Sequence, residues 1–211
     1  PVEGNKKKRS TDGDYYSRNH ELIKSIPDDL SIEVFFISDS VFEKNALSKY
    51  LTDSGLIEFF SAESFILKTV LPMMKQRLYQ DGGLPIVNFL QFSLFVFKNF
   101  EALSDSAKSK IKSDLFLLLD KEPCNTSGNL ISNGFQILYP AGYYSETGWS
   151  LFFDKKLDCD RCAVLSDEYL KIAGHIGTGA FETILGFLGA TKYPKTKKVT
   201  YNSYSSEIYR N

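Results

Sequence analysis

Leu84–Leu103, with the sequence LPIVNFLQFSLFVFKNFEAL, is the stretch that decides the fold of this chain. Apolar residues recur around nearly the whole circumference of a helix built from it, and the polar residues Asn88, Gln91, Lys98 and Asn99 fall on one narrow stripe. A helix that is apolar on most sides lies inside a protein, because its side chains gain free energy by leaving water. The stretch therefore predicts a buried central helix.

A membrane span is the alternative reading of the same stretch. A spanning helix needs roughly 20 predominantly apolar residues. Here the polar stripe and Ser93 interrupt the apolar run, and Glu101 closes it. Pro85 suits the first turn of a helix, where its missing N–H is not needed. These features favour a core helix that begins near Pro85.

Two more helices are predicted beside the central one. The first covers Ala62–Tyr79, and we expect Pro72 to bend it, because proline cannot donate a hydrogen bond inside a helix. Ser104 is placed to cap the third helix, which we extend to Leu119. Residues 61–119 therefore predict a central layer of about three helices.

Strand signals lie on both sides of this layer. Ser31–Ser38 is rich in β-branched and aromatic residues, which is typical of a strand. Turn-forming residues crowd the segment before Phe135–Tyr139 and predict a β-hairpin over residues 123–139, with its turn at residues 126–129. The predicted fold class is α+β, with the helical layer at the centre and the short strands and hairpin packed beside it.

The remaining segments complete the predicted order of elements. We expect short helices over Asp14–Ile26 and Ser40–Ser54, the second ended by Gly55. Gly174–Gly179 is expected to be a loop that leads into a last helix.

Changes in composition predict four regions. Residues 1–13 form a flexible basic lead-in, residues 14–120 a mainly helical α+β unit, residues 121–190 a hairpin and helix unit, and residues 191–211 a basic, tyrosine-rich tail.

The overall composition describes a globular chain with balanced charge. It has 211 residues, 43% of them hydrophobic, with 25 Lys and Arg against 26 Asp and Glu. This balance argues against a dedicated nucleic-acid or membrane-surface domain. Three cysteines predict no disulfide framework and fit a reducing compartment, and the N-terminus lacks the pattern of a signal peptide, so we expect a cytoplasmic protein. Because the chain begins with Pro1, we expect it to be a piece of a longer protein.

The most motif-like chemistry is the pair Cys159 and Cys162. Two thiolates at this spacing can bind one zinc ion, and His175 and Cys124 could complete four ligands. A closed zinc site usually has a second closely spaced pair, which Cys124 does not provide. A redox role needs a helix at the first cysteine and no flanking acids. Ordinary loop cysteines remain the simpler interpretation, and no cofactor other than this zinc ion is predicted.

Two further patterns allow anion binding. Gly174–Gly179 resembles a phosphate loop before a helix, although its glycine spacing differs and a tight turn is the simpler interpretation. Basic runs near both ends could contact a nucleic-acid backbone, although solvated linkers are the simpler interpretation. Their residues are Lys6, Lys7, Lys8, Arg9, Lys195, Lys197 and Lys198.

Catalytic signatures do not stand out in the sequence. It contains no G-x-S-x-G elbow, no HExxH and no Walker A motif. No pair of acidic residues is placed by its spacing on facing elements, as general acid–base catalysis by two carboxylates would require. We predict no catalytic residue in this segment.

A series of short motifs between residues 113 and 190 carries a family resemblance. They are a helix ending in Leu-Leu-Leu119, a polar segment, Ile137–Pro140, the run Leu165–Leu170 and a helix ending Gly186–Gly189. This order resembles segments outside the ATPase module of sacsin-like and NO VEIN-like proteins, which are large GHKL-type ATPases.

The resemblance implies a non-catalytic part of a larger protein. Sacsin relatives are chaperone-like, and bacterial relatives look like parts of phage-defence systems. The segment would then be an interaction or scaffold unit whose partners are other domains of its chain or other proteins. A nucleic-acid-binding accessory domain and a small zinc protein are the alternatives.

Overall fold

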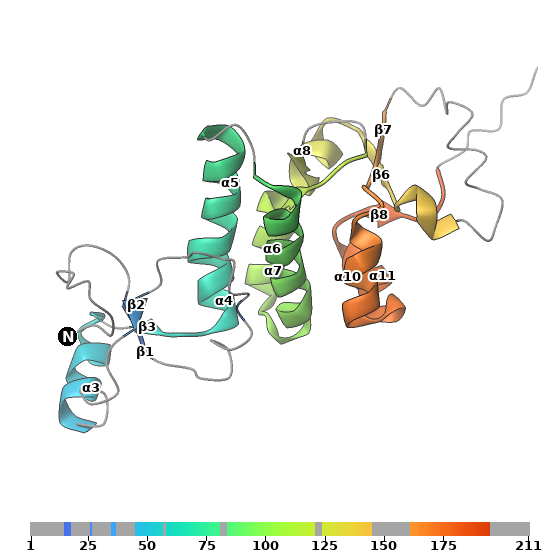
Figure 1. Ribbon diagram of the computed structural model, residues 1–211. Helices are drawn as coiled ribbons and strands as arrows, with labels where there is room; N and C mark the ends of the chain where they lie inside the picture. The colour runs from blue at the N-terminus through green and yellow to red at the C-terminus, as the bar shows by residue number, and fades with distance from the viewer. Residues whose placement is uncertain are drawn as a thin grey trace, which may run out of the picture.

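The computed structural model describes residues 15–17, 26, 35–36, 45–56, 58–80, 84–120, 124–144 and 161–194. Helices and short strands are mixed along this part of the chain, so the predicted α+β class is confirmed. Figure 1 shows a row of helices in the middle of the molecule, with a small sheet next to the last pair.

The N-terminal elements form a parallel sheet. Strand β1 (Tyr15–Ser17) pairs on one side with β2 (Phe35–Phe36) and on the other with β3 (Glu58–Phe59). The predicted helix over residues 14–26 is therefore wrong at its start, because pairing with two distant strands overrides the local helical pattern. Helix α3 (Asn45–Asp53) lies within the predicted helical segment, and Gly55 follows it with φ +70°.

The next helical segment changes its geometry ahead of Pro72. It comprises α4 (Ala62–Phe65), the π-helical turn η1 (Ile66–Val70) and α5 (Leu71–Gln80). The N–H of Leu71 bonds to the carbonyl of Ile66, five residues back. Proline has no N–H and crowds the preceding turn, so a widened turn at this point relieves the conflict.

The central helix is buried as predicted. Helix α6 (Ile86–Asn99) continues into a 3₁₀ turn, η2 (Phe100–Ala102), and places its phenylalanines in the core. Helix α7 (Asp105–Asp114) follows, and the hydroxyl of Ser104 accepts the N–H of Ala107 at 3.2 Å as an N-cap. The carboxylate of Glu63 accepts both the N–H and the O–H of Ser104 at 2.9 Å, which fixes the start of α7 against α4.

The predicted β-hairpin is wrong in its details. Strand β4 (Phe116–Leu117) pairs with β5 (Asn125–Thr126), and α7 accordingly ends before the predicted Leu119. The expected turn is instead the start of helix α8 (Ser127–Ser132), because the hydroxyl of Thr126 accepts the N–H of Asn129 at 3.2 Å. Thr, Ser, Gly and Asn suit a helix start as well as a turn, so the local residues allowed both.

A second parallel sheet has strand order β7–β6–β8. The central strand is β6 (Gln136–Leu138), and its neighbours are β7 (Cys162–Val164) and β8 (Ala190–Thr191). A 3₁₀ turn, η3 (Ala141–Tyr144), follows β6.

Helices α10 (Tyr169–Ile176) and α11 (Thr178–Phe187) connect β7 to β8. The predicted loop over residues 174–179 is wrong, because only Gly177 separates the two helices. Its φ of +86° suits glycine, which has no Cβ to strain this conformation.

One hydrophobic core joins these elements. Tyr169 of α10 stacks on Phe97 of α6 with ring centroids 6.3 Å apart, and Phe187 of α11 meets Phe100 at 5.2 Å. The core therefore continues across the predicted boundary at residues 120–121. Thr191, predicted to begin the tail, lies in β8.

Candidate functional site

The carboxyl ends of the second parallel sheet are the first place to look for a site. Strand β6 lies between β7 and β8, and both pairings are parallel, so the carboxyl ends of the three strands lie at one edge of the sheet. In open α/β sheets, ligands bind outside the carboxyl ends of the strands. Tyr139 follows β6 there, and Lys192 follows β8.

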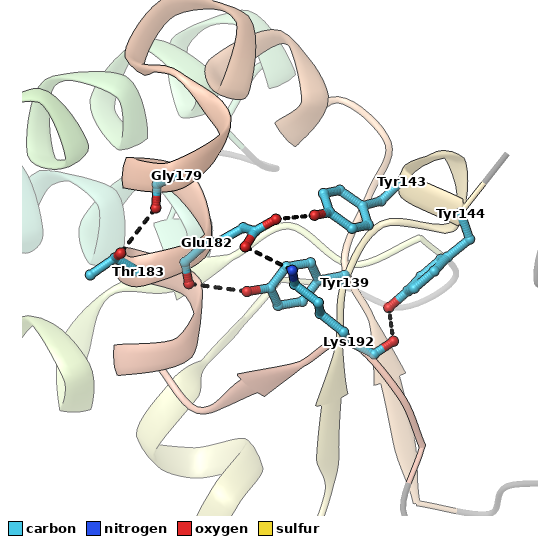
Figure 2. A network of polar contacts seen from close by, with 7 residues as sticks. All are labelled: Tyr139, Tyr143, Tyr144, Gly179, Glu182, Thr183 and Lys192. Atoms are coloured by element: carbon cyan, nitrogen blue, oxygen red, sulfur yellow. Dashed lines mark hydrogen bonds and ion pairs between the residues drawn. The ribbon is translucent and has the colours of Figure 1, made fainter. Parts of the chain in front are cut away.

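Five residues gather at this position, and we call them the tyrosine cluster. They are Tyr139, Tyr143, Tyr144, Glu182 and Lys192 (Figure 2). Three come from the segment after β6, one from α11 and one from the end of β8. Within α11, Phe181 and Ile184 turn into the core while Glu182 stays half-buried at the sheet's end.

Glu182 is the centre of the contacts. Its side chain accepts a hydrogen bond from the hydroxyl of Tyr143, and its other carboxylate oxygen lies 2.7 Å from Nζ of Lys192. Its backbone carbonyl accepts the hydroxyl of Tyr139 at 3.0 Å. Figure 2 shows these contacts converging from the helix and from both strand ends.

Lys192 completes the cluster on the strand side. Its ammonium group lies 5.6 Å from the ring centroid of Tyr143, within range of a cation–π attraction. Its backbone carbonyl accepts a hydrogen bond from the hydroxyl of Tyr144. Both the side chain and the backbone of Lys192 are therefore held.

Charges, hydrogen bonds and burial in the tyrosine cluster keep its carboxylate and ammonium groups charged and its tyrosines neutral. Hydrogen bonds from Lys192 and Tyr143 lower the pKa of Glu182, and the hydrogen bond to Glu182 raises the pKa of Lys192. Burial is the main cause that raises the pKa of Tyr139, and the negative charge of Glu182 adds to it. Burial also raises the pKa of Tyr143 and Tyr144.

Each of these shifts moves a pKa further from neutrality. A general acid or base works best when its pKa lies near the working pH. The cluster is therefore suited to fastening α11 and η3 to the ends of β6 and β8, and it is poorly suited to proton transfer at neutral pH.

Sequence reasoning did not find this cluster. Tyr139, Tyr143 and Tyr144 follow a strand closely, which is a weak local signal for an aromatic group at the strand's end. Glu182 and Lys192 are distant in sequence from these tyrosines, and only the parallel pairing of β6 with β8 brings Lys192 close to them.

The predicted zinc ligands are scattered over several elements. Cys124 is a half-buried free thiol whose pKa is raised by burial, and Cys162 lies in β7 and is disulfide-bonded. His175 is exposed near the end of α10. Among the described residues no three His, Cys, Asp or Glu side chains form a group that could hold a metal ion. Cys159 lies outside these residues. Because Cys162 in a disulfide has no thiolate to bind zinc, the four-ligand zinc site stays a prediction for the reduced chain alone.

The predicted nucleic-acid residues all lie outside the described residues. They are Lys6, Lys7, Lys8, Arg9, Lys195, Lys197 and Lys198. Binding to nucleic acid therefore also stays a prediction.

Large apolar side chains are exposed in groups on α3 and α6, and singly at Ile131 of α8 and at Tyr193. On α3, Leu47 is 41% exposed and Tyr50 is 65% exposed, and Leu56 just beyond the helix is 49% exposed. Residues three apart in a helix share a face, so Leu47 and Tyr50 form one apolar strip. In the first turn of α6, Ile86 and Val87 are 52% and 62% exposed.

Comparisons with known proteins assign this chain to no family. No protein-family model, curated protein or solved structure matches the chain. Within the described part of the chain, every helix is too short or too polar to span a bilayer.

Proposed function

We propose that this chain is a non-catalytic interaction and scaffold segment of a larger multidomain ATPase, either chaperone-like or defence-related. The observation that carries the interaction role is the apolar strip of Leu47 and Tyr50 on α3, with Leu56 beside it. Large apolar side chains that lie together on a surface are typical of a binding site for another protein surface. The motif order between residues 113 and 190 supports the larger ATPase as its context.

The tyrosine cluster supports the scaffold role. Its polar groups contact one another across a helix, a 3₁₀ turn and two strand ends, at the position where a small ligand would bind in many α/β sheets. Such contacts hold the elements in one arrangement, which an interaction surface requires.

A site-specific photo-crosslinker tests the proposal in the full-length product of the gene. We expect a crosslinker in place of Tyr50 to react with another domain or with a bound protein, because this side chain lies on the apolar strip. A crosslinker in place of Lys49, also exposed on α3 but polar in its native form, is the matched control and should react much less.

Two results would contradict the proposal. One is equal crosslinking from both positions, which would mean that the apolar strip contacts nothing specific. The other is hydrolysis of ATP by the isolated 211-residue chain, because the proposal assigns the ATPase activity to a different module.

A further inference from the structure

A groove of about 550 Å³ lies away from the tyrosine cluster. One wall is formed by η1 and α5, and the other by α7, β5 and the start of α8. We propose that this groove binds an acidic peptide segment of a partner protein, with a peptide carboxylate between Lys75 and Lys110. No residue of α3 lines the groove, so this proposal does not depend on the apolar strip.

The base of the groove is apolar. It is lined by Leu71 and Phe116, which are both buried, and by Leu67, which packs against the core. Pro72 extends the apolar surface toward solvent. An apolar side chain of a peptide would gain free energy by leaving water at this base.

Lys75 and Lys110 supply the positive charge. Lys75 comes from α5 and Lys110 from α7, and both line the groove and are exposed. Among the described residues, the ammonium group of neither lysine takes part in an ion pair or a hydrogen bond. Asp114 is the remaining charged residue in the lining, so two positive charges and one negative charge give +1. This charge complements an acidic occupant.

The walls also offer groups for a peptide backbone. The side-chain amide nitrogen of Asn129 donates to the side-chain oxygen of Asn125 at 2.7 Å, and both residues line the groove. Side-chain amides held in this way suit the amide groups of a peptide.

The shape favours a peptide over a small molecule. Pockets for small ligands enclose most of the ligand's surface. The lining residues Pro72, Lys75 and Lys110 are exposed, so the groove can cover one face of an extended chain and leave the other in water.

Selection from a random heptapeptide library displayed on phage tests the proposal with the 211-residue chain as bait. We expect enriched peptides to combine an Asp or Glu with a neighbouring large apolar residue. The most enriched peptide, made synthetically with a fluorescent label, should bind the chain with an affinity that falls as salt rises. Its version with Gln in place of the acidic residue should bind more weakly.

Charge-reversal variants locate the binding. Lys75→Glu with Lys110→Glu should weaken binding of the labelled peptide by at least about tenfold, because two attractive contacts become repulsive. Lys98→Glu, on the exposed side of α6 and outside the groove, should change it less than about twofold. Circular-dichroism melts will confirm that all variants fold, which is expected because these lysines are exposed. The proposal is overturned by enrichment of peptides without acidic residues, by no enrichment, or by equal loss in the Lys98→Glu variant.

Discussion

At the scale of single residues, Tyr169 makes the contact that ties α10 to the central helix. Its ring stacks on Phe97, and its hydroxyl accepts the N–H of Leu118 at 3.2 Å. The side chain is fully buried, and burial raises the pKa of its hydroxyl. One side chain therefore contributes both to the apolar core and to the pairing of backbone groups near β4.

Removing only this hydroxyl should destabilise the chain. Tyr169→Phe keeps the ring but leaves the N–H of Leu118 without its acceptor, so we expect a loss of about 1–3 kcal/mol in the free energy of unfolding. Urea denaturation followed by circular dichroism measures it. Tyr50→Phe, on the exposed strip, is the control and should stay within about 0.5 kcal/mol of the wild type. Equal effects of the two substitutions would show that the hydroxyl of Tyr169 has no structural role.

Glu182 should make the stability depend on pH in acid. Its pKa lies below the ordinary value of 4.5 because of its hydrogen bonds from Lys192 and Tyr143. The stability that this carboxylate contributes is complete above the unfolded-state pKa and is lost as the pH falls through the lower pKa of the folded state. The difference in unfolding free energy between the wild type and Glu182→Gln should therefore be constant near neutral pH and shrink below about pH 4.5.

Chemical denaturation over a pH series measures this difference. Glu101→Gln, at an exposed position in η2, is the matched control and should behave like the wild type at each pH. A gap between the wild type and Glu182→Gln that widens in acid would contradict the contacts described for the tyrosine cluster.

At the scale of elements, Gly177 sets the junction between α10 and α11. Its φ of +86° and ψ of +146° lie in a region that residues with a Cβ rarely adopt. Gly174, one turn earlier in α10, has helical neighbours and open space where a Cβ would be placed. The same substitution should therefore have opposite effects at the two glycines.

We expect Gly177→Ala to destabilise the chain by about 1–3 kcal/mol through backbone strain. Gly174→Ala should instead stabilise it by about 0.5–1 kcal/mol, because alanine loses less conformational freedom in a helix. Thermal unfolding of the two variants beside the wild type is the measurement. Stabilisation by both substitutions would mean that α10 and α11 form one continuous helix.

Elements whose signals are local could be predicted from the sequence. The central helix follows from its own apolar pattern, and the hydroxyl of Ser104 caps α7 as its position indicated. Residues 126–129 are of types that suit both a turn and a helix start. The sequence alone therefore does not distinguish a hairpin from α8. The order β7–β6–β8 depends on pairing between distant segments, which local patterns do not encode. The tyrosine cluster depends on that order, so it could not be predicted either.

At the scale of the whole molecule, the central claim is that one phenylalanine-rich core makes the described helices and the second sheet a single scaffold. The core cluster includes Phe65, Phe92 and Phe97 from the helical layer together with Ile137 and Leu185 from the C-terminal half. A scaffold built this way unfolds as one cooperative unit, because its halves share buried surface.

Native-state hydrogen exchange on Phe97→Ala tests this claim most directly. The substitution removes the stacking partner of Tyr169 and leaves a cavity in the shared core, so it should cost about 3–5 kcal/mol. We predict that the slowest amides of β6, such as Ile137 and Leu138, lose as much protection as those of α6 itself. Unchanged protection in β6 beside a large loss in α6 would contradict the claim and would mean that the two halves are separate folding units.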